Sequence, residues 1–150
     1  MPRTAELSED RVAEVLDVIV GIIRDPEGRV LIGQRPAGKH MAGHWEFPGG
    51  KLEAAESPLD GLKRELLEEI GIVTGPAEPF LKLTHRYPER TVRLDIWWVL
   101  GYEGEVRARE GQALRWVDLD ELAAAPLLPA DAPIVASIRR RLVSRAQGRT

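Results

Sequence analysis

The chain has 150 residues, 43% of them hydrophobic, which is enough for one domain with a buried core and requires no second domain. It contains no cysteine, so it has no disulfide framework, no thiol nucleophile and no thiolate zinc site. This composition fits a reducing cytosol. A net charge of −3 gives no general attraction to nucleic acid, and no apolar run approaches the length of a membrane span. We therefore expect one cytoplasmic domain, residues 1–150, with no nucleic-acid or membrane partner.

The first part of the chain predicts two strands joined by a turn. Residues 1–10 are polar and acidic and are expected to form a loose lead-in. Glu14–Arg24 is a nearly continuous apolar run, which predicts a largely buried strand. A turn at Asp25–Gly28 leads into a second strand at Arg29–Arg35, and we expect these two strands to pair as a hairpin.

A loop and a glycine turn follow. Residues 36–43 predict a loop, so His40 and His44, whose spacing suits zinc only on a helix, are not expected to bind metal. Trp45–Phe47 predicts a short strand. The run Pro48-Gly49-Gly50 allows a tight turn that brings the backbone close to a ligand, so a carbonyl oxygen here can reach a metal ion.

The best-defined element is a helix predicted over Ser57–Ile70. Ser57 is a good N-cap, Pro58 suits the first helical position, and Gly71 tolerates the positive φ that ends many helices. At about 100° per residue, the apolar side chains of this helix fall within roughly an 80° arc. They are Leu59, Leu62, Leu66 and Ile70. Such a stripe is suited to packing on a sheet.

The second half of the chain predicts further strands. After a loop at Ile72–Pro79, the segments Phe80–Tyr87 and Val92–Tyr102 are expected to form an antiparallel pair. Ala113–Val117 is expected to be the last strand.

Two helices are predicted to close the chain. Asp118 can cap a short helix that reaches Ala125, and an amphipathic helix is expected from Ala130 to about Ser144. The basic residues near its end are expected to form an exposed charged face rather than a nucleic-acid site. They are Arg139, Arg140, Arg141, Arg145 and Arg149.

Three glutamates of the predicted helix at Ser57–Ile70 repel one another. Glu65, Glu68 and Glu69 lie at i, i+3 and i+4, where like charges repel by roughly 0.2–0.5 kcal/mol per pair, and each loses solvation beside the core. Arg64 can neutralise only part of this charge. Hard oxygen donors that converge from a helix and a loop suit Mg²⁺ or Mn²⁺. A solvated, glutamate-rich helix face is the alternative that these residues alone leave open.

The spacing around the glutamates matches a known signature. Gly50 is followed by five residues, Glu56, seven residues and then Arg64–Ile72, which reads Arg-Glu-aliphatic-any-Glu-Glu-any-Gly-aliphatic. In this stretch the chain resembles the Nudix hydrolases at every defined position. The resemblance implies an α+β fold, an α/β/α sandwich with a mixed β-sheet, and metal-dependent hydrolysis of a nucleoside diphosphate linked to another group. The chemistry agrees, because acidic side chains can serve a pyrophosphate only by holding metal ions against it.

Other stretches resemble the MutT-type branch of this family. They are Gly33–Pro36, Trp45–Gly50, Tyr87–Arg90, Glu110–Gln112 and Leu128–Pro133. MutT-type proteins hydrolyse 8-oxo-dGTP to the monophosphate and pyrophosphate, which removes it from the nucleotide pool. The resemblance therefore implies a nucleoside triphosphate substrate and Mg²⁺, with Mn²⁺ as a possible substitute, in either a monomer or a homodimer.

The resemblance also implies roles for individual residues. Catalysis would depend on Glu65, Glu68, Glu69, Arg64 and Glu110. The metal ligands would be the carbonyl of Gly49 and the side chains of Glu56, Glu65, Glu68, Glu69 and Glu110. The substrate would be bound by Arg35, Phe47, Lys51, Glu89, Arg90 and Asp131.

Two positions depart from the MutT pattern. Ala55 stands where the family usually has glycine, and Asp131 replaces a base-contacting asparagine. An ionised aspartate only accepts hydrogen bonds, whereas asparagine both accepts and donates them. Because the Ala-Asp-x-Pro pattern also resembles relatives that hydrolyse cytidine nucleotides, a (d)CTP pyrophosphohydrolase is the alternative enzyme. A nucleotide-binding regulator without turnover is the alternative outside the enzymes.

Overall fold

The computed structural model describes residues 14–147; the lead-in expected at residues 1–10 and Arg149 lie outside this range. The strands and the first helix, in chain order, are β1 (Val15–Ile22), β2 (Val30–Gln34), β3 (Trp45–Glu46), β4 (Gly49–Lys51), α2 (Pro58–Ile70), β5 (Val73–Thr74), β6 (Ala77–Arg86), β7 (Thr91–Val99), β8 (Tyr102–Glu103) and β9 (Leu114–Val117). The chain closes with α3 (Leu119–Ala124), the 3₁₀ turn η1 (Pro129–Asp131) and α4 (Ala132–Gln147).

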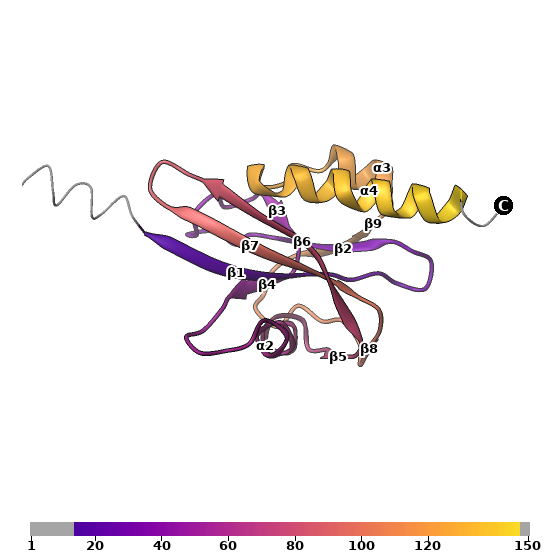
Figure 1. The fold of residues 1–150 in the computed structure, drawn as a ribbon, viewed down its shortest axis with the longest axis horizontal. Helices are drawn as coiled ribbons and strands as arrows, with labels where there is room; N and C mark the ends of the chain where they lie inside the picture. The colour runs from indigo at the N-terminus through magenta and orange to yellow at the C-terminus, as the bar shows by residue number, and fades with distance from the viewer. Residues whose placement is uncertain (1–13, 148–150) are drawn as a thin grey trace, which may run out of the picture.

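These elements form three layers, with α2 beneath the strands and with α3 and α4 above them (Figure 1). The largest sheet has the order β4-β1-β7-β6, in which β1 runs parallel to β7 and antiparallel to β4. A second sheet has the order β3-β2-β9, and β5 pairs with β8. The predicted α/β/α sandwich with a mixed sheet is confirmed, as is the antiparallel pair formed by β6 and β7.

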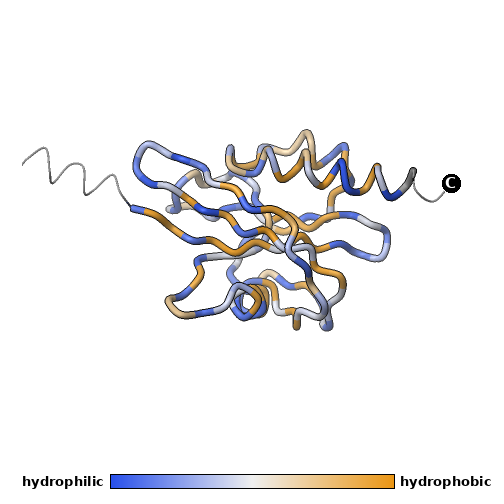
Figure 2. Tube along the Cα trace, viewed as in Figure 1, coloured by the Kyte–Doolittle hydropathy of each residue, from blue (hydrophilic) through white to orange (hydrophobic). Residues whose placement is uncertain are grey.

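The strands are buried on both faces, so the protein has a core above them and a core below them. The upper core includes Val20, Ile22, Ile32, Ile96, Ile134 and Ile138. The lower core includes Ile19, Leu31, Leu62, Leu66 and Ile70. Successive residues of β1 point to opposite faces, so this strand contributes to both cores. Figure 2 shows the hydrophobic stretches along the central strands and hydrophilic turns at their ends. The apolar stripe predicted for α2 is confirmed.

The pairing of β1 with β2 differs from the expected hairpin. Next to the predicted turn, Arg24 and Val30 form an isolated bridge and the Leu31 N–H donates to the Ile23 carbonyl at 3.0 Å. Beyond this point the strands separate, because both edges of β1 are occupied by β4 and β7. The hairpin prediction was therefore wrong for all but the residues beside the turn.

Two further segments differ from the prediction. The loop expected at Ile72–Pro79 contains β5 and the first residues of β6. The basic face of α4 is also incomplete, because Arg141 lies over the ring of Trp98, 4.1 Å from its centroid, and forms an ion pair with Glu78. A guanidinium on an aromatic face is attracted by the ring quadrupole. Arg141 therefore holds α4 against β6 and β7 instead of facing solvent.

None of the helices within residues 14–147 has the length and apolar character needed to cross a membrane.

The ends of α2 follow the sequence prediction. Ser57 Oγ accepts a hydrogen bond from the Asp60 N–H at 3.2 Å, and Pro58 occupies the first helical position. Gly71 ends the helix with a φ of 72°, and its N–H donates to the Leu67 carbonyl at 3.1 Å. Glycine adopts this left-handed conformation without the steric cost that a Cβ imposes. The local sequence thus defines both ends of the helix that carries the glutamates.

The loop before α2 contains a strained position. Ala55 has a φ of 64°, in the left-handed region that costs a residue with a Cβ about 1–2 kcal/mol. This is the position at which the Nudix pattern usually has glycine. The chain therefore keeps the loop conformation although its residue does not favour it.

We expect Ala55→Gly to raise the free energy of unfolding by up to about 1 kcal/mol, because relief of this strain outweighs the about 0.5–1 kcal/mol that glycine costs in chain entropy. Urea denaturation measures the change. Ala54→Gly is the matched control, since Ala54 has no positive φ and should lose about 0.5–1 kcal/mol. Equal losses in the two variants would show that Ala55 is not strained.

Candidate functional site

A cavity of about 640 Å³ is lined by residues of α2, of the strands β1 to β4 and β7, and of η1. Part of its lining is apolar and comes from β1 and β7, with Leu16, Val18, Val20, Val92 and Leu94. Another part carries the glutamates of α2, and a third part carries the aromatic and acidic side chains of Phe47, Tyr87 and Asp131. The cavity therefore offers both an acidic region and a region suited to a flat, partly apolar group.

Four glutamates line the acidic region. Glu65, Glu68 and Glu69 come from α2, and Glu110 comes from the loop between β8 and β9. A Cβ at position 50 would overlap the Glu65 carboxylate, so glycine here lets β4 lie directly against this side chain, whereas a Cβ at position 49 would overlap the backbone carbonyl of Ile19. The glycine turn predicted from the sequence thus brings the backbone directly to the carboxylates.

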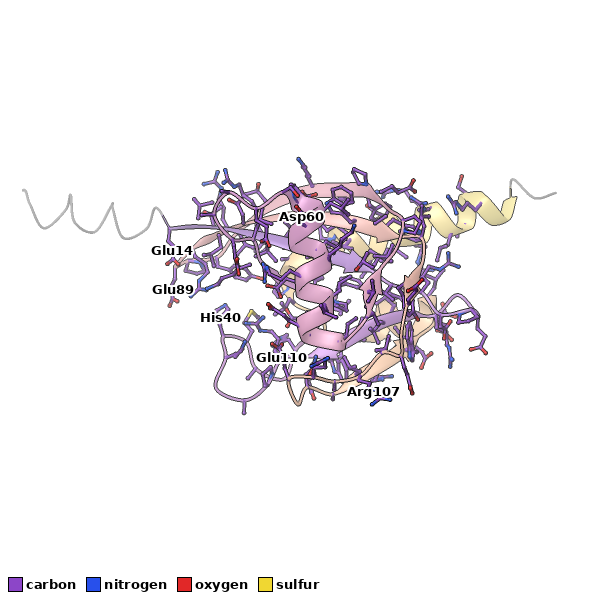
Figure 3. The ribbon with its side chains drawn as sticks, turned by 90° about the horizontal axis from the view of Figure 1, so that it is seen from below. Glu14, His40, Asp60, Glu89, Arg107 and Glu110 are labelled. Carbon is purple, nitrogen blue, oxygen red and sulfur yellow. The ribbon has the colours of Figure 1, made fainter. Side chains whose placement is uncertain are left out.

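Hydrogen bonds fasten the loop of Glu110 to the last turn of α2. The Arg109 N–H and the Gln112 side-chain amide both donate to the Glu69 carbonyl, each at 3.1 Å. Gln112 Oε1 accepts from the Glu110 N–H at 3.0 Å. Figure 3 shows Glu110 beside the end of α2 that lies opposite Asp60. These bonds hold the loop where Glu110 lines the same cavity as the glutamates of α2.

Arg64 is surrounded by carboxylates. Its Nε and Nη2 donate to the two oxygens of Glu56 at 2.7 and 2.9 Å, and its Nη1 donates to Glu65 at 2.8 Å and to Glu68 at 3.3 Å. Nη2 also donates to the Lys51 carbonyl at 3.0 Å. The hydrogen bonds from Arg64 lower the pKa of Glu56 to about 2. Glu56 does not line the cavity, so the structure places it as a partner of Arg64.

Glu69 is the glutamate whose charge is least compensated. Its pKa is raised to about 8, chiefly by burial and also by repulsion from Glu46, Glu110 and Glu65, although the hydrogen bond that the Gly49 N–H donates to its Oε2 at 3.0 Å lowers it. Burial also raises the pKa of Glu65, against the effect of Arg64. The acidic region therefore favours any ligand that brings positive charge.

The glutamates suit a divalent cation by their chemistry. Among residues 14–147, no three acidic or imidazole side chains lie close enough together to hold a metal ion as they stand. Carboxylate oxygens are nevertheless the donors that Mg²⁺ and Mn²⁺ prefer, and a cation would offset the charge that raises the pKa of Glu69. The predicted cluster is thus assembled around one cavity without forming a closed site.

A second charged group lies beside the apolar part of the cavity. Arg35 Nη1 donates to both oxygens of Glu46, at 3.0 and 3.3 Å. Arg35 Nε donates to the His40 carbonyl at 2.7 Å, so the guanidinium also holds the loop at residues 36–43. Phe47, which follows β3 directly, is 4% exposed. These contacts give the cavity a fixed wall on the side of β2 and β3.

Asp131 is buried in the same cavity without a full set of partners. Asp131 is 5% exposed, and its Oδ2 has no hydrogen-bond partner among the described residues. Its pKa is raised to about 8, chiefly by burial and also by repulsion from Glu46, while attraction to Arg35 lowers it. At neutral pH the carboxyl group is therefore mostly protonated and can both donate and accept hydrogen bonds. The expectation of an ionised Asp131 was wrong, because the sequence does not show burial.

Most of the predicted substrate residues meet in this cavity. Its lining includes Arg35, Phe47, Lys51, Arg90 and Asp131. Glu89 does not line it; this residue is exposed in the turn between β6 and β7, away from α2 (Figure 3). Other lining residues were not predicted from the sequence, among them Gln34, Lys39, His40, Glu46, Tyr87, Gln112 and Leu128. All of these except Lys39 and His40 could have been found, since they stand inside stretches that carry the MutT-type resemblance.

Comparison with known proteins agrees with this geometry. A protein of Escherichia coli (strain K12) named 8-oxo-dGTP diphosphatase is 41% identical over 125 residues, which cover 83% of this chain and 97% of that protein. The CTP pyrophosphohydrolase of the same organism is 38% identical over 122 residues, which cover 81% of this chain and 90% of that protein.

A solved structure from a study of MutT from Aliivibrio salmonicida and Vibrio cholerae matches with a TM-score of 0.75 at 32% identity, covering 85% of this chain and 99% of that one. Residues 19–137 match the family model described as NUDIX domain, a range that contains all the glutamates of the acidic region. The chain belongs to the NUDIX domain family.

Proposed function

We propose that this chain is a Mg²⁺-dependent nucleoside triphosphate pyrophosphohydrolase that converts 8-oxo-dGTP to 8-oxo-dGMP and pyrophosphate. The observation that carries the proposal is one cavity that combines the four glutamates of the acidic region with a buried, protonated Asp131. The first group suits a metal-bound phosphate chain, and the second suits the edge of a base. Similarity to an 8-oxo-dGTP diphosphatase supports the choice of substrate.

Glu65, Glu68, Glu69 and Glu110 would hold the cation, with the Gly49 carbonyl as a further oxygen donor. When bound, a divalent cation neutralises phosphate charge and makes phosphorus more open to attack by water. We assign Glu56 a positioning role through Arg64, because both of its oxygens already accept hydrogen bonds from that guanidinium. Lys51 and Arg90 line the same cavity and can bind phosphate oxygens by charge.

Glu69 is well placed to take a proton from the attacking water. A general base must present an unprotonated oxygen to the water, and a bound cation would keep the buried Glu69 carboxylate ionised. The Gly49 N–H orients one carboxylate oxygen, which leaves the other free for the water or the cation. Arg64 orients Glu65 in a similar way from the other side.

Asp131 can distinguish oxidised guanine from guanine. The edge of 8-oxoguanine presents an N7–H donor beside the O6 acceptor, and a protonated carboxyl group can bind both at once. Normal guanine presents two acceptors, N7 and O6, so one acceptor of the carboxyl group meets another acceptor. A site built around such a pair of hydrogen bonds can discriminate by several orders of magnitude. Asp131 would therefore bind 8-oxo-dGTP and reject dGTP.

A (d)CTP pyrophosphohydrolase is the second candidate, and Asp131 is also the observation that favours it. Cytosine presents its N4 amine beside the N3 acceptor, which match a protonated carboxyl group equally well. Initial rates with Mg²⁺ over 8-oxo-dGTP, dGTP, CTP, dCTP and ADP-ribose would test both candidates. No turnover of any of these would instead support a nucleotide-binding regulator.

We expect Glu69→Gln to slow kcat for 8-oxo-dGTP by about 10²-fold or more, because the amide keeps the shape but can neither take a proton nor neutralise a cation. Initial rates and circular dichroism give the two measurements. Glu103→Gln is the matched control, since Glu103 is exposed in β8 outside the cavity and should keep the wild-type rate. A folded Glu69→Gln variant with a near-normal rate would remove Glu69 from the reaction.

We expect Mg²⁺ or Mn²⁺ to raise the melting temperature, and most strongly with a nucleotide present. At a hundredfold excess over Kd a ligand of the folded state stabilises it by about 2.7 kcal/mol, which is about 5–10 °C for a chain of this size. Glu103→Gln should show the same shift, whereas Glu69→Gln should show a smaller one. An unchanged melting temperature at millimolar Mg²⁺, with and without nucleotide, would favour a solvated glutamate face.

As the pH rises through about 8, we expect kcat/KM for 8-oxo-dGTP to fall further in the wild type than in Asp131→Asn, because Asp131 then loses the proton that it donates to O6, whereas the amide does not titrate. The contact at N7, which separates 8-oxo-dGTP from dGTP, does not use this proton. The measurement is kcat/KM for 8-oxo-dGTP in both proteins from pH 6 to 9. A parallel pH profile in the two proteins would show that the proton on Asp131 does not read the base.

The stability of the metal-free protein provides a check that needs no nucleotide. Asp131 has a normal pKa of 3.8 when unfolded and a pKa of about 8 when folded, so its contribution to stability is complete below 3.8 and is lost as the pH rises towards 8. The difference in unfolding free energy between Asp131→Asn and the wild type should therefore grow in favour of Asn over this range.

A further inference from the structure

One buried glutamine connects the backbones of two glutamates of the acidic region. Gln112 is 8% exposed, and both ends of its side-chain amide are in use. Its Nε2 donates to the Glu69 carbonyl at 3.1 Å, and its Oε1 accepts from the Glu110 N–H at 3.0 Å. Glu69 lies in α2, whereas Glu110 lies in the loop between β8 and β9. A single side chain therefore joins this loop to the helix.

The end of α2 is the part of the helix that the loop contacts. A helix leaves its last carbonyl groups without partners of its own, and the loop supplies two of the missing donors. The Arg109 N–H donates to the Glu69 carbonyl at 3.1 Å, and the Arg107 N–H donates to the Ile70 carbonyl at 2.9 Å. These two bonds hold the loop before Glu110. Gln112 holds the N–H of Glu110 itself, which is the residue that carries the carboxylate.

The backbone beside Gln112 is fixed by the sheet. The Gln34 N–H donates to the Ala113 carbonyl at 2.9 Å, and β9, which begins at the next residue, pairs with β2. Within the described part of the chain, a Cβ at Gly111 would meet nothing within 4 Å apart from its neighbours in sequence, so packing there does not hold the turn. The amide of Gln112 thus links Glu110 both to the sheet and to the helix.

We propose that Gln112 is a positioning residue that holds the Glu110 carboxylate beside the glutamates of α2, and thereby strengthens the binding of a divalent cation. This inference rests on the proposed role of Glu110 as a metal ligand. The amide offers one donor and one acceptor at a fixed separation, so it satisfies both backbone groups at only one spacing of loop and helix. Residues that orient metal ligands typically contribute about 10–100-fold to metal affinity or activity.

Gln112→Met keeps the length of the side chain and removes both hydrogen bonds. We expect the Kd of the nucleotide-free protein for Mn²⁺, measured by electron paramagnetic resonance of the free ion, to rise about tenfold. The Mg²⁺ concentration that gives half-maximal hydrolysis of 8-oxo-dGTP should rise by a similar factor. At saturating Mg²⁺, kcat should stay close to wild type, because the groups that contact the substrate are unchanged.

Ile138→Val is the matched control for a general loss of stability. Ile138 is buried in α4 and does not line the cavity. The lost methyl group should lower the melting temperature without changing the Kd for Mn²⁺. If Gln112→Met does not fold, Gln112→Asn takes its place, since it keeps a buried amide that is one methylene too short to join both partners.

A double-mutant cycle with Glu110→Gln shows whether Gln112 acts through Glu110. In the Glu110→Gln background, adding Gln112→Met should leave the Kd for Mn²⁺ unchanged, because there is no carboxylate left to position. An equal rise in both backgrounds would mean that Gln112 acts through α2 instead. A lower melting temperature with an unchanged Kd in Gln112→Met itself would mean that Gln112 only stabilises the fold. Either result overturns the proposal.

The single glutamate variants separate this inference from the proposed function. A wild type that neither binds Mn²⁺ nor needs Mg²⁺ for hydrolysis overturns the proposed function and this inference with it. If Glu69→Gln weakens Mn²⁺ binding but Glu110→Gln does not, the proposed function stands and Glu110 is not a metal ligand. That result overturns the role of Gln112 alone.

Discussion

Negative charge held beside a hydrophobic core is the constraint on which this site depends. Glu65 and Glu69 are partly buried, and Glu68 and Glu110 add charge to the same cavity. Arg64 offsets part of it by donating to two glutamates of α2 and to a third in the preceding loop. One guanidinium cannot neutralise all of these carboxylates, so the cavity retains a preference for added positive charge. A divalent cation that accompanies a phosphate chain meets this preference.

The arrangement of the fold around α2 follows from the same constraint. Leu62, Leu66 and Ile70 bury one side of the helix, so the glutamates on the neighbouring arc face the cavity. Glycine at position 50 lets β4 lie directly against the Glu65 carboxylate, and the loop of Glu110 is fastened to the last turn of the helix. The core therefore sets the rotation of the helix, and the backbone around it sets how near other donors can come.

Local sequence predicted the features that depend on local geometry, such as the caps and apolar stripe of α2, the glycine turn and the glutamate cluster. It failed where distant segments decide. β1 does not form the expected hairpin, because β4 and β7 occupy both of its edges. Arg141 does not lie on the exposed face of α4, because it contacts Trp98 and Glu78. Glu56 was expected to be a metal ligand, but the sequence could not show that Arg64 donates to both of its oxygens. Such pairings cannot be read from periodicity.

The protonation of Asp131 is the most consequential feature that the sequence could not show. Attraction to the Arg35 guanidinium lowers the pKa of Asp131, but that guanidinium already donates to both oxygens of Glu46. Glu46 and Asp131 thus share one guanidinium. Because Asp131 is buried, its protonated form has a lower free energy than its charged form at neutral pH. A protonated carboxyl group and an amide offer the same pair of functions, one donor and one acceptor. The replacement of the family's asparagine by Asp131 therefore preserves base reading near neutral pH while making it depend on a proton.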